Sequence, residues 1–135
     1  MTSAVVIDSG VLLALWDPDD TQHQAAVAAL ERHLADGSRL VVPVTALSEV
    51  LVGAFRATPY AVRTIEGFVD DLVGDVRAAD RAVGRATARL LVDHPTLTLA
   101  EALLLATCEV VGAQEVLTTN PRLEKVDRRV LVLTG

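Results

Sequence analysis

Aromatic residues and cysteine are scarce in this chain. Aromatic side chains make up 3% of its 135 residues, whereas 51% of the residues are hydrophobic. The core must therefore be built from Val, Leu, Ile and Ala. The single cysteine, Cys108, excludes an internal disulfide and a cysteine-based zinc site. It lies in an apolar run, which is typical of an inert core residue.

Long apolar runs and an excess of basic charge are also missing. No uninterrupted apolar run reaches the roughly 20 residues that a membrane helix needs. No charged segment followed by a long apolar stretch opens the chain, so we expect no signal peptide and a cytoplasmic protein. The net charge is −6, and binding to nucleic acid depends mainly on neutralising phosphates with Lys and Arg. A nucleic-acid function would therefore need divalent cations that bridge carboxylates and phosphates, or a local Arg cluster.

What the chain does have is an alternation of apolar strands and amphipathic helices. Its length fits one domain over residues 1–135, without internal repeats or linkers. Strands are predicted at Ala4–Ile7, Leu40–Pro43, Glu115–Thr118 and Val130–Leu133, with a further short strand within Leu72–Val76. Helices are predicted at Val11–Trp16, His23–Leu34, Thr45–Arg56 (with Thr45 as the cap), Ala61–Asp70, Asp80–Val92 and Thr98–Val111. Strands separated by helices predict an α/β fold with a parallel sheet and right-handed crossovers.

The first strand ends abruptly in a carboxylate, Asp8. In open α/β sheets, ligands and catalytic groups gather at the edge where the strands end. Ser9 and Gly10 then allow a turn into the first helix. The alternative is that Asp8 only caps this helix, its oxygen accepting free backbone N–H groups.

Three more polar residues stand at the starts or ends of elements, and each also has a purely structural interpretation. By helical spacing, Glu49 faces solvent. Glu101 follows Thr98 in a capping-box pattern, although a carboxylate on an otherwise apolar helix still needs a reason. Asn120 precedes Pro121 as a helix cap would.

Taken in order, these residues resemble the PIN-domain family, in particular the small VapC-type toxins of bacterial toxin–antitoxin pairs. The resemblance covers essentially the whole chain. The matching segments are Val5–Ser9, the turn from Asp17 to His23, Val42-Pro43 with Leu47–Val50, Leu97–Ala102 and Gly112–Asn120.

The resemblance implies a three-layer α/β/α sandwich with a mostly parallel central sheet. It also implies an endoribonuclease that depends on Mg²⁺ or Mn²⁺. Asp8 and Glu49 stand at the first two acidic positions. Glu101 stands where the family usually has Asp, and Asn120 stands where the family often has a fourth acid. Thr118 matches a recurrent hydroxyl.

These positions define the expected site. Asp8, Glu49 and Glu101 would be catalytic metal ligands, Asn120 an outer ligand, and Thr118 and Ser9 supporting residues. The side chains expected to hold substrate phosphates are those of Arg56, Arg63 and Arg122. The expected partners are a single-stranded or looped RNA, a small antitoxin protein and a second copy of the chain, with no membrane.

Two other interpretations remain open at this point. The departures at Glu101 and Asn120 are consistent with a catalytically impaired PIN module that acts by binding RNA or protein. A response-regulator receiver shares the α/β architecture, but it needs a pair of acids after its first strand. Here Ser9 follows Asp8, and Pro43 ends the second strand.

Overall fold

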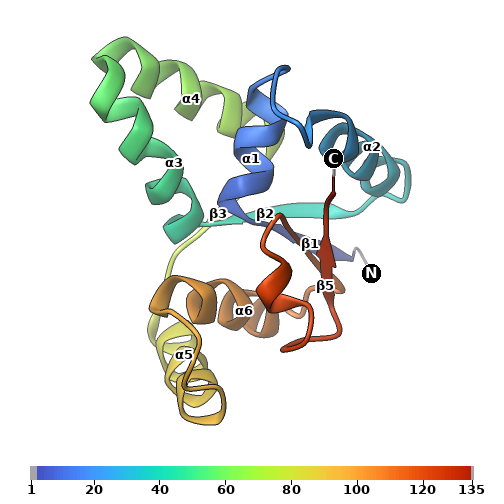
Figure 1. The fold of residues 1–135 in the computed structure, drawn as a ribbon, viewed down its shortest axis with the longest axis vertical. Coiled ribbons are helices and arrows are strands. Elements are labelled where there is room, and N and C mark those ends of the chain that lie inside the picture. The colour runs from blue at the N-terminus through green and yellow to red at the C-terminus, as the bar shows by residue number, and fades with distance from the viewer. Residues whose placement is uncertain (1–2, 135) are drawn as a thin grey trace.

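A five-stranded parallel sheet forms the centre of the computed structural model, which describes residues 3–134 (Figure 1). The strand order is β3-β2-β1-β4-β5, and every neighbouring pair is parallel. The strands are β1 (Ala4–Ile7), β2 (Arg39–Pro43), β3 (Asp75–Arg77), β4 (Glu115–Thr118) and β5 (Val130–Val132). The predicted parallel sheet is confirmed.

Within the described residues, six α-helices cover the two faces of this sheet. They are α1 (Ser9–Trp16), α2 (His23–Ala35), α3 (Val44–Ala57), α4 (Pro59–Leu72), α5 (Arg81–Asp93) and α6 (Leu99–Val111). Helices α1 to α4 pack on one face, and α5 and α6 pack on the other (Figure 1). The expected three-layer α/β/α sandwich is therefore confirmed.

Strand β1 lies at the centre of the sheet and is buried on both faces. Val5 and Ile7 belong to the core under α1 to α4, whereas Val6 belongs to the core under α6. All four residues of β1 are buried, as expected for a central parallel strand. Because β1 pairs with both β2 and β4, the residue that follows it, Asp8, lies in the middle of the carboxyl edge.

Several element boundaries differ from the predicted ones, and three of these differences have a visible structural cause. Thr45 is not the cap of α3, because the extended Pro43 (φ −62°, ψ 142°) ends β2 and the helix begins at Val44. Helix α4 begins at Pro59, since the Thr58 side chain accepts a hydrogen bond from the Ala61 amide. Helix α4 then continues to Leu72, which displaces β3 to Asp75–Arg77.

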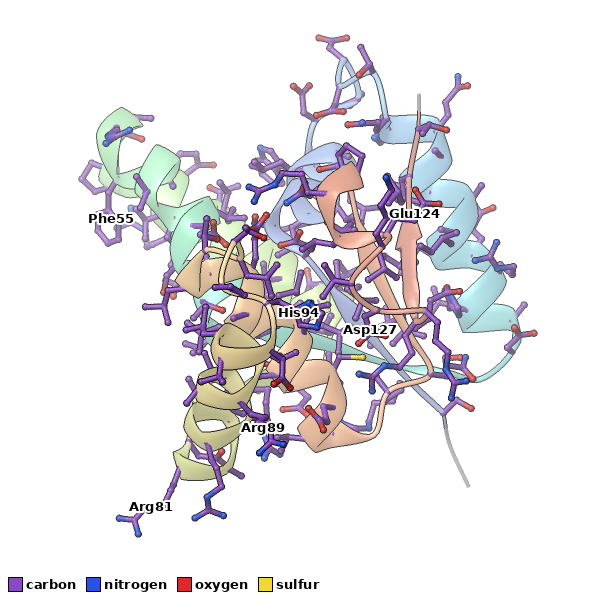
Figure 2. The ribbon with its side chains drawn as sticks, turned by 60° about the horizontal axis from the view of Figure 1, so that its bottom comes forward. Phe55, Arg81, Arg89, His94, Glu124 and Asp127 are labelled. Atoms are coloured by element: carbon purple, nitrogen blue, oxygen red, sulfur yellow. The ribbon has the colours of Figure 1, made fainter. Side chains whose placement is uncertain are left out.

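Helix α5 is amphipathic as its sequence predicts. Val83 is buried and the three Arg residues of the helix are exposed; Figure 2 shows Arg81 extending away from the start of the helix. Thr87 is buried as well, which the apolar pattern does not indicate. Its hydroxyl donates a 2.7 Å hydrogen bond to the Val83 carbonyl, so no polar group is left unpaired there.

Cys108 lies buried on α6, as predicted. Burial raises the pKa of its thiol to about 11, so the thiol stays protonated and unreactive near neutral pH. Among residues 3–134, no helix has the length and apolar character needed to cross a membrane.

Candidate active site

A pocket of about 310 Å³ lies at the carboxyl edge of the sheet. It brings together residues from four separate segments of the chain. The predicted site residues that line it are Asp8, Ser9, Glu49, Glu101 and Asn120. Because parallel strands all end at the same edge, the side chains that follow β1 and β4 meet there with the starts of α3 and α6.

Asp8 both caps a helix and lines this pocket. Its Oδ1 accepts a 2.7 Å hydrogen bond from the Ser9 amide at the start of α1. Its Oδ2 accepts a 2.6 Å hydrogen bond from the Thr118 hydroxyl at the end of β4. The structural and the functional interpretation of Asp8 are therefore compatible, since a carboxylate has further lone pairs to offer.

Glu49 lies on α3, is exposed to solvent as its helical spacing predicts, and also lines the pocket. Partial burial of the carboxyl group raises its pKa, and the negative charge of Asp8 raises it further, while a hydrogen bond involving Ser9 lowers it. No ion-pair partner for Glu49 lies within residues 3–134. The two carboxylates thus repel each other, an arrangement that a cation would relieve.

Glu101 accepts hydrogen bonds on its carboxylate and also has an ion-pair partner. Its Oε1 accepts a 2.9 Å hydrogen bond from the Thr98 amide, and the Thr98 hydroxyl accepts one from the Glu101 amide, which completes the predicted capping box. Its Oε2 accepts a 2.7 Å hydrogen bond from Asn120 Nδ2 and lies 3.4 Å from Arg122 Nη1. Burial raises the pKa of Glu101, but these hydrogen bonds and the Arg122 charge outweigh it, so the pKa falls below its ordinary value.

Thr118 and Asn120 connect Asp8 with Glu101 through a chain of hydrogen bonds. Thr118 Oγ1 donates to Asp8 and accepts a 3.1 Å hydrogen bond from the Asn120 amide. The Asn120 side chain donates to Glu101 through Nδ2 and accepts a 3.0 Å hydrogen bond from the Arg122 amide through Oδ1. Asn120 also caps the 3-10 helix η1 (Pro121–Leu123), as the sequence predicts.

The three predicted phosphate-binding arginines lie in different places. Arg122 is beside the pocket, where it pairs with Glu101. Arg56 lines a separate hollow on α3, and Arg63 is exposed on α4; neither lines the pocket. The pocket is also lined by Gly10 and Thr119, which were not predicted as site residues. These two residues lie close together, since a Cβ at Gly10 would lie only 2.1 Å from Thr119 Oγ1.

The donor set of the pocket suits Mg²⁺ or Mn²⁺ by its chemistry, because these hard cations prefer carboxylate oxygens and water. As folded, however, no three Asp, Glu, His or Cys side chains among residues 3–134 are grouped as a ready-made metal site. Asp8 and Glu49 repel each other and have no ion-pair partner among residues 3–134, whereas Glu101 is paired with Arg122. A cation would therefore bind to Asp8 and Glu49 more readily than to Glu101.

The PIN-domain family model matches residues 5–129. The chain belongs to the PIN-domain family. Solved structures with this PIN fold include a toxin–antitoxin complex from Klebsiella pneumoniae, with 20% identity, a TM-score of 0.74 and coverage of 95% of this chain and 96% of that chain. VapBC2 from Rickettsia felis, bound to a promoter DNA fragment, has 10% identity and a TM-score of 0.76, with coverage of 97% and 99%.

A third similar structure is VapC20 from Mycobacterium tuberculosis, described as a sarcin–ricin loop cleaving toxin. It has 17% identity and a TM-score of 0.64, with coverage of 83% of this chain and 86% of that chain. No curated protein matches the chain significantly. At these identities the structural likeness shows a shared fold.

The PIN fold also distinguishes this chain from a receiver domain. Receivers have the flavodoxin-like strand order 2-1-3-4-5, in which the first strand pairs with the second and third. Here β1 pairs with β2 and β4. The PIN assignment thus agrees with the topology, and the receiver interpretation is wrong.

Proposed function

We propose that this PIN domain is a divalent-metal-dependent endoribonuclease of the VapC type. The single observation that carries the proposal is that Asp8, Glu49 and Glu101, from three distant segments, line one pocket at the carboxyl edge of the sheet. Membership of the PIN family and the likeness to solved toxins support a nuclease toxin.

Each acid has a distinct task in the proposed hydrolysis of RNA. Asp8, fixed by the Ser9 amide and Thr118, is the central metal ligand. Glu49 is the second ligand, from where it can also orient the attacking water. Glu101 acts through water from its hydrogen-bonded position at the start of α6. A bound Mg²⁺ or Mn²⁺ would lower the pKa of water and stabilise the negative charge on the phosphate oxygens.

The substrate is expected to approach as single-stranded or looped RNA, whose unstacked backbone can enter a recessed site. One structural neighbour is described as cleaving the sarcin–ricin loop. The protein carries a net charge of −6, so it attracts phosphates only through local cations. Arg122 stands beside the pocket and is the first candidate; Arg56 and Arg63 would contact RNA farther away.

The decisive experiment replaces Asp8 with Asn. Asp8→Asn is expected to lower Mn²⁺-dependent RNA cleavage at least about a hundred-fold, because it removes the central anionic ligand. The melting temperature stays the same or rises, since one of two repelling charges is gone. Asp19→Asn, on an exposed turn, is the matched control with the same charge change. Full cleavage activity in folded Asp8→Asn protein that still binds Mn²⁺ would refute the assignment.

A catalytically impaired PIN module is the second candidate, and the occupied carboxylate of Glu101 favours it. Titration with Mg²⁺ and Mn²⁺ separates the two. The nuclease binds at least one of these ions at millimolar concentration or below, and cleavage depends on it. A module that binds RNA without taking up either ion supports the second candidate.

An antitoxin is the proposed protein partner, because the structural neighbours include toxin–antitoxin complexes. Helix α3 and the start of α4 expose apolar side chains for such a contact, including Phe55 and Tyr60, each 70% exposed. Figure 2 shows Phe55 at the outer edge of the molecule. Phe55 borders a hollow that runs along the same helix as Glu49. Co-purification with the product of an adjacent short gene, weakened by Phe55→Asp, would support this site.

A second copy of the chain is the other proposed partner. A groove of about 580 Å³ between α5 and α6 is lined by small and apolar side chains, and beside it Val92 is 77% exposed. Arg85 and Glu109 also line the groove, and neither has an ion-pair partner in the described part of the chain. In a two-fold dimer, Arg85 of each copy can pair with Glu109 of the other.

A further inference from the structure

The three acids of the pocket are held in two different electrostatic states. Asp8 and Glu49 line the same pocket, and neither has an ion-pair partner among residues 3–134. Glu101 receives two hydrogen bonds and one ion pair on its carboxylate, from the Thr98 amide, Asn120 Nδ2 and Arg122 Nη1. Among residues 3–134, a cationic side chain therefore pairs with only one of the three acids, Glu101.

Three interactions hold Arg122 beside Glu101. Its Nη2 donates a 3.1 Å hydrogen bond to the Thr96 carbonyl, while its Nη1 lies 3.4 Å from Glu101 Oε2. Its backbone amide donates to Asn120 Oδ1. The guanidinium is thus directed at Glu101 by the turn that follows β4, although the side chain is 57% exposed.

The orientation of the Asn120 amide follows from its partners. Nδ2 faces the Glu101 carboxylate, which only accepts hydrogen bonds, and Oδ1 faces the Arg122 backbone N–H, which only donates. A flipped amide would lose both bonds. In this arrangement Asn120 Oδ1 accepts a hydrogen bond from the main chain, and Asn120 Nδ2 donates one to Glu101.

We propose that Asn120 and Arg122 form an internal clamp on Glu101, in which Arg122 competes with a divalent cation for this carboxylate. The inference rests on the proposed function, since it concerns the same metal. Asn120 is a positioning residue in this arrangement. Coordination by Glu101 requires the guanidinium to leave, and the freed Arg122 then lies beside the pocket, where a substrate phosphate would pair with it. Metal and RNA would therefore favour each other's binding.

The clamp is tested by isothermal titration of Mn²⁺ into the metal-free protein. Arg122→Gln removes the competing charge and is expected to tighten Mn²⁺ binding about two- to five-fold, the range for one partly exposed ion pair. Asn120→Ala is expected to tighten binding too, although it leaves the net charge unchanged. A side chain that were itself a metal ligand would show the opposite effect, because its removal weakens binding.

Arg89→Gln is the matched control, because it makes the same charge change on α5, where the side chain pairs only with Asp93. Its Mn²⁺ affinity is expected to equal that of the wild type, since the charge is distant and screened. Because the Arg122 side chain is more than half exposed, Arg122→Gln is expected to fold, and it carries the test even where Asn120→Ala does not fold.

The outcomes separate the clamp from the function on which it rests. Equal Mn²⁺ affinity in the wild type and Arg122→Gln overturns the clamp but does not contradict the proposed metal site. Equal tightening by Arg122→Gln and Arg89→Gln also overturns it, because a general charge effect then suffices. The absence of Mn²⁺ binding in both the wild type and Arg122→Gln overturns the clamp and the metal-dependent function together.

Discussion

Gly10 sets how closely helix α1 can approach the loop after β4. A Cβ at this position would lie 2.1 Å from Thr119 Oγ1 and 3.3 Å from Thr119 Cβ. Rotation of the Thr119 side chain moves the hydroxyl away but leaves its Cβ in place. Glycine is therefore favoured here by the close approach of the Thr119 side chain, and not by an unusual backbone conformation.

Gly10→Ala is expected to lower the free energy of unfolding by about 1–3 kcal/mol, the usual cost of overpacking. Urea unfolding measures this. Thr119→Ala in the same chain removes the hydroxyl and methyl groups and should restore part of the loss. A Gly10→Ala protein as stable as the wild type would show that the loop after β4 moves freely, contrary to the contact described here.

Asp8, Glu101 and Asn120 show why single residues could be interpreted in two ways from the sequence. Each makes the capping contact that its local pattern predicts. Each also lines the common pocket. Capping uses one or two lone pairs of a carboxylate or amide and leaves others available, so local pattern alone could not decide between structure and function.

Helix α6 holds Glu101 in place through its first turn. The hydroxyl of Thr98 accepts a hydrogen bond from the Glu101 amide, and the Thr98 amide donates a hydrogen bond to the Glu101 carboxylate. Thr98→Ala removes the first of these bonds and is expected to cost about 1 kcal/mol of unfolding free energy, measured with urea. Thr98→Ser keeps the hydroxyl and should remain within about 0.5 kcal/mol of the wild type. Equal stability of the Ala and Ser variants would contradict a working cap.

Most elements could be predicted because their signals are local. Apolar runs such as Ala4–Ile7 and Glu115–Thr118 appear as strands with the predicted bounds. The mistaken cap at Thr45 has a different cause: Pro43 has the extended dihedral angles of a cap residue while still ending β2. A local pattern of preferred cap residues does not contain that information, because it depends on how the strand leaves the sheet.

The pocket itself is a property of the whole chain. Its formation needs the strand order β2-β1-β4, which brings α3, β1 and the turn after β4 to one place. The order of motifs along the sequence suggested this through a family resemblance. Helical spacing correctly placed Glu49 towards solvent, but it did not indicate that Glu49 also lines the pocket. The contacts of Asn120 with Glu101 and Arg122 depend on side-chain directions that no spacing rule supplies.

The two exposed apolar regions lie on opposite sides of the sheet and make distinguishable predictions. Val92→Asp places a charge beside the groove between α5 and α6 and should shift the protein from dimer to monomer. Light scattering coupled to size-exclusion chromatography measures this. Phe55→Asp makes the same kind of change on α3 and should leave the dimer intact. A wild-type protein that is monomeric at tens of micromolar would refute the proposed dimer, and loss of the dimer only in Phe55→Asp would move the interface to α3.

The central position of β1 has a consequence for synthesis on the ribosome. Strand β1 is translated before the other strands of this sheet and gains its second neighbour only when β4 has emerged, and the hydrogen bond from Thr118 to Asp8 spans 110 residues. Closure of such a distant pairing is slow and comes late. A nascent or prematurely terminated chain therefore carries Asp8 and Glu49 without the rest of the pocket. Under the proposed function, RNA cleavage therefore requires a chain that has been translated through β4 and the turn that follows it.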